Sequence, residues 1–167
     1  MKKLFLSLAL AAAFVGFNAS ADDNTGSLRE TYVESVSQDY VDFFFNGFVF
    51  KIPQNVSVNM EGQEATIKSN DGTFGVSIKT EKDSKATAQG AYEICQRSAS
   101  ELHLKQPKLT KISINGLEGA SVEGELEGMN VAVEVLDAGK RYLKVIVLYT
   151  DAHVQDAKTV LTSAVKE

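Results

Sequence analysis

Hydrophobic and polar residues alternate along much of the chain after residue 40, as expected for β-strands that bury one face. The first such stretch, Tyr40–Ile52, contains Asn46-Gly47 between two aromatic runs. Asn-Gly supplies the positive φ angles of a two-residue hairpin turn, so we expect two paired strands here, closed by Pro53. A period of two places these residues on the buried face of the hairpin: Phe44, Phe48, Phe50 and Ile52.

Further alternating stretches predict more strands, separated by turn residues such as Asn70-Asp71-Gly72 and Asn115-Gly116. The stretch Tyr142–Thr150 is apolar on both faces except at Lys144, which predicts a central strand covered on both sides. The expected strands that precede it are Asn55–Met60, Ala65–Lys68, Thr73–Thr80, Leu109–Ile114, Leu117–Leu126 and Met129–Leu136.

In two segments the apolar residues recur with the period of an amphipathic helix. Between Lys85 and Leu104, apolar residues recur every three or four positions, with Ser84 as the expected N-cap and Pro107 as the stop signal. A second apolar stripe predicts a final helix over Ala152–Lys166.

Strands joined by short turns form antiparallel sheets, and two amphipathic helices can cover such a sheet. The sequence therefore predicts a single α+β domain over residues 39–167. In it, an antiparallel sheet of about six to eight strands packs between two main helices, as an α/β/α sandwich.

The N-terminus has the three parts of a secretory signal peptide. Lys2 and Lys3 precede the apolar run Leu4–Phe17, and small residues at 19 and 21 form an Ala-x-Ala cleavage pattern. The apolar run is shorter than the roughly 20 residues that span a bilayer, so we expect cleavage after Ala21 rather than a membrane anchor. Export would place the protein in the periplasm or outside the cell. Residues 22–38 are polar and are expected to be a linker or a loosely packed entry segment.

The charge balance bears on the choice of partner. The chain has 22 acidic against 17 basic residues and a formal net charge of −5, which falls to −7 when Lys2 and Lys3 are removed. Nucleic acids and anionic membranes attract basic surfaces, so neither is an expected partner. The single cysteine, Cys95, has no partner for an intrachain disulfide.

The sequence gives little support for a catalytic or a metal-binding site. Cys95 and His103 lie eight residues apart on one predicted helix, about 12 Å along its axis, which is too far for a nucleophile and its base. His103 and His153 have no local metal-ligand spacing. Glu123 and Glu125 share one strand face and could act as a carboxylate pair, although a solvated sheet face is the commoner role. We therefore predict no cofactor, no metal and no catalytic residue.

The aromatic hairpin offers a candidate binding surface. The face of the hairpin opposite the predicted core carries Phe43, Phe45 and Val49. An exposed apolar patch of this kind is typical of a site for a partner or ligand. Alternatively, residues 22–38 could cover it.

The order of elements and a few local phrases resemble the PsbP-like superfamily, named for an extrinsic subunit of photosystem II. The resemblance extends over residues 40–166 and rests on Phe48–Pro53, Ile114–Leu117 and Val160–Ser163. It implies an antiparallel sheet between helices and a non-enzymatic binding or accessory role. The sequence departs from the family pattern at Gln54 and Ala164, where aromatic residues are often found. No functional residue of the family can be matched to this chain.

Three functions remain as hypotheses. The first is an exported, non-catalytic binding or accessory module that acts through a surface on a protein or small-molecule partner. The second is a carrier of a small apolar ligand held in a cavity between sheet and helix. The third is a small hydrolase that uses surface carboxylates around Glu123 and Glu125.

Overall fold

The structure is a computed structural model, and it describes residues 39–167. The predicted signal peptide and residues 22–38 lie outside the described residues. None of the helices in the described part is long and apolar enough to cross a membrane.

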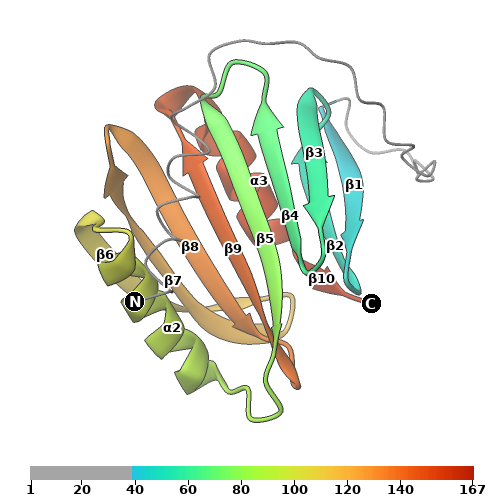
Figure 1. The fold of residues 1–167 in the computed structure, drawn as a ribbon, viewed down its shortest axis with the longest axis vertical. Coiled ribbons are helices and arrows are strands. Elements are labelled where there is room, and N and C mark those ends of the chain that lie inside the picture. Colours follow the sequence, from blue (N-terminus) through green and yellow to red (C-terminus); the bar gives the residue numbers. More distant parts are fainter. Residues whose placement is uncertain (1–38) are drawn as a thin grey trace.

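Seven antiparallel strands form the main sheet, in the order β3-β4-β5-β9-β8-β7-β6 (Figure 1). The apolar strand β9 lies at its centre, as predicted, because it pairs with both β5 and β8. The strands of this sheet are β3 (Val56–Glu61), β4 (Glu64–Ser69), β5 (Phe74–Lys82), β6 (Lys105–Ile114), β7 (Leu117–Leu126), β8 (Met129–Asp137) and β9 (Arg141–Tyr149).

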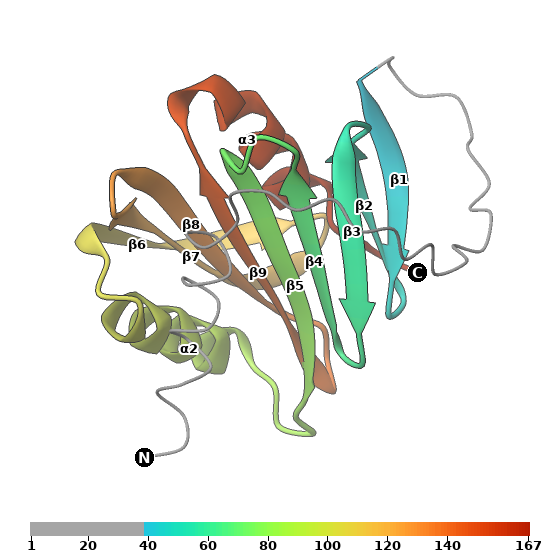
Figure 2. The same cartoon turned by 45° about the horizontal axis from the view of Figure 1, so that its top comes forward.

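A second sheet of three strands has the order β1-β2-β10 and lies beside β3 and β4 (Figures 1 and 2). It combines the N-terminal hairpin, β1 (Tyr40–Phe45) and β2 (Phe48–Pro53), with the short C-terminal strand β10 (Val165–Lys166). The Asn46-Gly47 turn has the positive φ angles that its sequence predicts, 50° and 76°.

Two helices cover opposite faces of the main sheet (Figures 1 and 2). Helix α2 (Ala88–Glu101) packs on β7 and β8. Helix α3 (Val154–Ser163) follows the short 3-10 turn η1 (Asp151–His153) and packs on β2 and β9. The two faces accordingly bury two separate hydrophobic clusters, one under each helix. The predicted α+β fold with an antiparallel sheet between two helices is thus confirmed.

The boundaries of both helices differ from the prediction. Helix α2 begins after Thr87, whose hydroxyl oxygen accepts a hydrogen bond from Gly90 N at 3.0 Å, and not after Ser84. Pro107 lies inside the edge strand β6, where a missing N–H is tolerated and the pairing with β7 is irregular. The final helix ends at Ser163 because the chain turns there and pairs Val165 with Val49 of β2.

The structure also corrects which face of the hairpin Phe44 lies on. The two-residue turn pairs Phe45 with Phe48 and Phe43 with Phe50, so these four side chains share one face. A period of two therefore cannot be counted through the turn, because odd positions on β1 oppose even positions on β2. Phe44 lies on the outer face instead, and 43% of its side chain is exposed.

Candidate functional site

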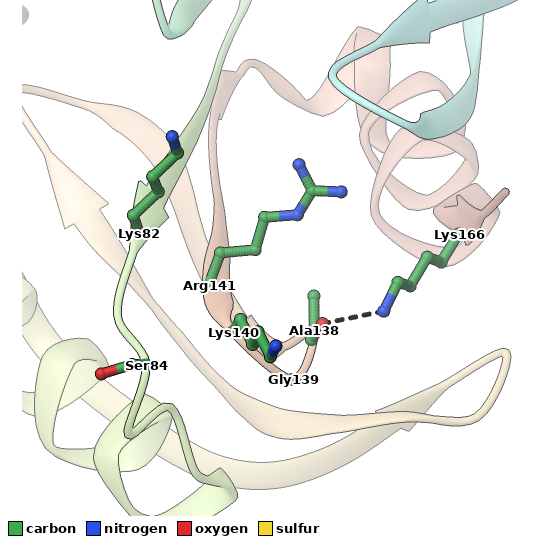
Figure 3. Close-up of a pocket in the computed structure, with 7 residues that line it drawn as sticks. All are labelled: Lys82, Ser84, Ala138, Gly139, Lys140, Arg141 and Lys166. Carbon is green, nitrogen blue, oxygen red and sulfur yellow. Dashed lines mark hydrogen bonds between the residues drawn. The ribbon is translucent and has the colours of Figure 1, made fainter.

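A hollow of about 750 Å³ opens at one end of the main sheet, where β5, the β8–β9 turn and β10 meet (Figure 3). Most of its lining side chains are cationic, and no carboxylate lines it. We call this hollow the basic pocket, and its lining residues are Lys82, Ser84, Ala138, Gly139, Lys140, Arg141 and Lys166.

The register of the sheet brings two of these cations together. Lys82 and Arg141 are direct partners at the end of the β5–β9 pairing, so their side chains leave the same face of the sheet. The residues before them on this face, such as Ile78 and Val145, belong to the core under α3. The buried face of the sheet therefore ends in a pair of like charges. Side chains in directly opposed positions have Cβ atoms about 4.5–5.5 Å apart, and like charges placed this way repel.

The guanidinium of Arg141 is held against the second sheet. It lies over the ring of Phe48, 5.0 Å from the ring centroid, in a cation–π contact. Gly47 lies beside it with a φ of +76°, and a Cβ at this position would come 3.1 Å from an Arg141 Nη atom. Glycine thus meets two needs here, the backbone conformation of the hairpin turn and the space taken by Arg141.

Lys166 reaches the basic pocket from the opposite side. It pairs with Phe48 in the β2–β10 ladder, and its Nζ donates a hydrogen bond to the carbonyl oxygen of Ala138 at 2.9 Å (Figure 3). The pocket is thus built across the junction of the two sheets. An ammonium group has three N–H donors, so two remain for other acceptors.

The turn at the base of the pocket is fixed by local hydrogen bonds. Asp137 Oδ1 accepts from Gly139 N at 2.8 Å, and Ala138 N donates to the carbonyl oxygen of Arg141 at 3.0 Å. Asp83 N donates to Lys140 O at 3.1 Å, which ties the β5–α2 loop to the same turn. The cations are therefore presented by an ordered backbone.

Two acidic side chains next to Lys82 in the sequence have other partners. Asp83 Oδ1 accepts from the backbone of Lys85 at 2.8 Å, and Glu81 forms an ion pair with Lys79 at 3.3 Å. Within residues 39–167, none of the four cations of the basic pocket forms an ion pair with a carboxylate. A chain with a net charge of −5 thus gathers four positive charges in one hollow. Such an arrangement is suited to binding an anion.

The structure does not bring the predicted surface of Phe43, Phe45 and Val49 together on one face. Phe45 is buried in the core with 2% of its area exposed, and Phe43 is half-buried against the same core. Val49 lies on the outer face, directly opposite Phe44 on β1 and Val165 on β10. An outer apolar row of Phe44, Val49 and Val165 replaces the predicted set.

The structure places Cys95 and His103 in different surroundings. Burial raises the pKa of the Cys95 thiol to about 12, and its Sγ contacts the carbonyl oxygen of Ala120 at 3.1 Å. His103 is exposed beyond the end of α2. His153 Nδ1 lies 2.6 Å from Asp156 Oδ2, at the start of α3. Within residues 39–167 no group of three or more His, Cys, Asp and Glu side chains could hold a metal ion.

The carboxylates of β7 and β8 differ from one another. Glu123 and Glu125 are exposed, whereas Glu134 on β8 is 6% exposed. Burial, and to a smaller degree the charge of Glu123, raises the pKa of Glu134 to about 8. One oxygen of Glu134 has no hydrogen-bond partner within the described part of the chain. Neither Glu123 nor Glu125 lines the basic pocket.

The basic pocket was not predicted from the sequence. Ser84 was expected only as a helix N-cap, with no connection to Lys82 or Lys166. Only the β5–β9 register and the β2–β10 pairing bring these residues together. A pattern read along the chain does not contain that information.

Comparisons with known proteins inform the fold. No protein-family profile matches the sequence, and no curated protein matches it significantly. The structure is similar to the solution structure of cyanobacterial PsbP (CyanoP) from Synechocystis sp. PCC 6803. The TM-score is 0.57 at 11% sequence identity, over 86% of this chain and 99% of that one. The chain has a PsbP-like fold.

A second similar structure is a protein from Bacteroides thetaiotaomicron VPI-5482. The match has a TM-score of 0.51 at 12% identity and covers 72% of this chain and 45% of that protein. The PsbP-like resemblance drawn from the sequence is therefore confirmed at the level of the fold. Sequence identities this low do not support assigning the function of either similar protein to this chain.

Proposed function

We propose that this PsbP-like protein is an exported, non-catalytic binding module that holds an anionic group of its ligand or partner in the basic pocket. The observation that supports this most directly is the pairing of Lys82 opposite Arg141 in an open hollow with no carboxylate in its lining. Two like charges in directly opposed positions destabilise the end of a strand pair. An anion bound between them offsets that repulsion in proportion to its charge.

The side chains of the pocket favour binding over catalysis. Its polar groups are four cations and the hydroxyl of Ser84, a set that attracts and orients an anion. A nucleophilic hydroxyl needs an adjacent general base, and no histidine or carboxylate lines this hollow. The pocket does not support the hydrolase hypothesis, because Glu123 and Glu125 lie on β7 outside it. It does not support the apolar-carrier hypothesis either, because charged side chains surround the hollow.

Export is part of the same proposal and rests on the sequence of residues 1–21. A periplasmic or extracellular location would expose the pocket to small anions and to acidic partner proteins. The net negative charge of the chain favours a localised contact at the pocket over general attraction to anionic surfaces.

Titration with simple anions tests the proposal. The chain would be expressed with its leader, purified as the host processes it, and titrated with sulfate, phosphate and citrate at low ionic strength. We expect backbone amide NMR shifts to concentrate at 82–84 and 138–141. The double variant Lys82→Glu/Lys140→Glu should abolish these shifts. Lys158→Gln, an exposed change on α3, should leave them unchanged. Shifts scattered evenly over the surface, or none with any anion, would contradict the proposal.

A further inference from the structure

The cations of the basic pocket come from separate elements that face one another across the hollow. Lys82 ends β5, Lys140 and Arg141 belong to the β8–β9 turn and the start of β9, and Lys166 belongs to β10. In Figure 3, Arg141 lies between Lys82 on one side and Lys166 on the other. A ligand must extend across the hollow to meet all of them at once.

The charge of the pocket exceeds what one small anion can neutralise. Four cations line it, and none is paired with a carboxylate within residues 39–167. A monovalent anion would leave most of this charge, including much of the Lys82–Arg141 repulsion, uncompensated. A compact ligand with several negative charges gains attraction from every cation, and the gain grows with each charge it carries.

The donors of the pocket suit phosphate oxygens. The face of the Arg141 guanidinium is covered by Phe48, so its N–H groups point outward along the plane of the group. This planar fork binds phosphate with two parallel hydrogen bonds. Lys82 and Lys140 add mobile point charges, and the two remaining N–H donors of Lys166 can meet a second group. A chain of linked phosphates presents oxygens in many directions, whereas a carboxylate presents two in one plane.

We propose that the basic pocket selects ligands with at least two linked phosphate groups, an inference that rests on the proposed function. The structure favours this class because Lys82 and Arg141 can hold one phosphate while Lys166 reaches the next. Two sources share this chemistry, an inorganic polyphosphate chain and an organic diphosphate. The volume of about 750 Å³ accommodates either.

Calorimetric titration of the processed protein at fixed ionic strength tests the inference. The probes are phosphate, pyrophosphate, tripolyphosphate, citrate and adenosine diphosphate. We expect tripolyphosphate to bind at least about tenfold more tightly than phosphate, since each added charge meets a further cation. Citrate carries about the same charge as pyrophosphate near neutral pH but lacks its geometry, so it should bind more weakly than either linked phosphate. Tighter binding of adenosine diphosphate than of pyrophosphate would identify the organic source, and the reverse order the inorganic one.

Substitution of Lys166 separates the two phosphate positions. Lys166→Gln should lower tripolyphosphate affinity several-fold and change phosphate affinity little, because phosphate is held by Lys82 and Arg141. Lys166→Arg should restore tripolyphosphate binding, which excludes a general loosening of β10. Lys158→Gln serves as the matched control.

The outcomes distinguish the inference from the proposed function. Equal affinities for phosphate and tripolyphosphate, or citrate as tight as tripolyphosphate, would overturn the inference and leave an anion-binding module. A loss of phosphate binding in Lys166→Gln as large as the loss of tripolyphosphate binding would also overturn it. Failure of every anion to bind would overturn both.

Discussion

The guanidinium of Arg141 lies over the ring of Phe48, 5.0 Å from its centroid, and this contact joins the main sheet to the three-stranded sheet. A cation–π contact at a partly exposed site contributes about 0.5–1 kcal/mol. It also fixes the direction in which Arg141 enters the basic pocket. One side chain thus serves both the packing of the two sheets and the candidate binding site.

We expect Arg141→Ala to lower the free energy of unfolding by about 1 kcal/mol and to weaken anion binding. Arg141→Lys should keep part of the binding, because the charge remains, and lose the planar contact with Phe48. Urea denaturation measures the first effect and calorimetric titration the second. Arg97→Ala is the control, since the side chain of Arg97 is 67% exposed. An equal loss of stability in Arg97→Ala would show that the Phe48 contact contributes nothing.

Lys82→Gln should have opposite effects on stability and on binding. The change removes the repulsion between Lys82 and Arg141, so the ligand-free protein should become more stable at low salt, by a few tenths of a kcal/mol. High salt screens exposed charges, and the difference should shrink toward zero at 1 M salt. Anion affinity should fall in the same variant. Denaturation at two salt concentrations tests this, and a loss of stability at low salt would contradict it.

Glu134 should make the protein less stable as the pH rises from about 4.5 to 8. Its carboxyl is buried on β8, and its pKa is raised from 4.5 to about 8 in the folded state. The folded state therefore binds the proton more tightly than the unfolded state. The resulting stabilisation is complete at a pH below the pKa of Glu134 in the unfolded state. It is lost as the pH rises through the pKa of Glu134 in the folded state.

Glu134→Gln retains a neutral side chain of the same shape and should remove this pH dependence. We expect the variant to match the wild type at pH 4 and to exceed it in stability at pH 8, by a kcal/mol or more. Denaturant titrations at pH 4, 6 and 8 measure the difference. Glu61→Gln, at an exposed position on β3, should show no such trend. Parallel curves for wild type and Glu134→Gln would show that Glu134 does not titrate differently in the folded state.

The sequence predicts the elements well because their signals are local. Asn46-Gly47 determines the first hairpin, and the apolar stripe of α2 determines a helix. The two faces of β9, apolar from Tyr142 onward except at Lys144, place it at the centre of the sheet. Each of these features depends on residues that are neighbours along the chain, so periodicity and turn chemistry are sufficient.

The candidate site could not be predicted in the same way because it depends on pairing between distant segments. Lys82 and Arg141 are 59 positions apart and meet only through the β5–β9 register. Lys166 was expected on a helix, and it reaches Ala138 only because β10 leaves α3 to pair with β2. Patterns along a chain predict which face of a strand is buried, but they do not predict which strand lies beside it.

Gly90 in α2 is required by a contact with the sheet and not by the helix. A Cβ at this position would lie 2.1 Å from the hydroxyl oxygen of Tyr142, which accepts a hydrogen bond from Thr87 N at 3.1 Å. Alanine normally stabilises a helix by about 1 kcal/mol relative to glycine. We expect Gly90→Ala to destabilise the protein despite this preference. In the Tyr142→Phe background, which lacks the hydroxyl, the cost should shrink or become a gain. Thermal unfolding of the wild type, the two single variants and the double variant tests this coupling, and an equal cost in both backgrounds would contradict it.

The hairpin register predicts opposite consequences for two adjacent phenylalanines. Phe45 is 2% exposed and stacks beside Phe43 at 6.3 Å between ring centroids, whereas 43% of Phe44 is exposed on the outer face. Removal of a buried phenylalanine side chain costs about 3–5 kcal/mol, while a change at an exposed position usually costs less than about 0.5 kcal/mol. Phe45→Ala should therefore unfold most of the domain under mild denaturant, and Phe44→Ala should leave its stability nearly unchanged. Urea denaturation followed by circular dichroism provides the measurement. The alternation first expected from the sequence, with Phe44 in the core, requires the reverse order, so this pair of variants decides between the two registers.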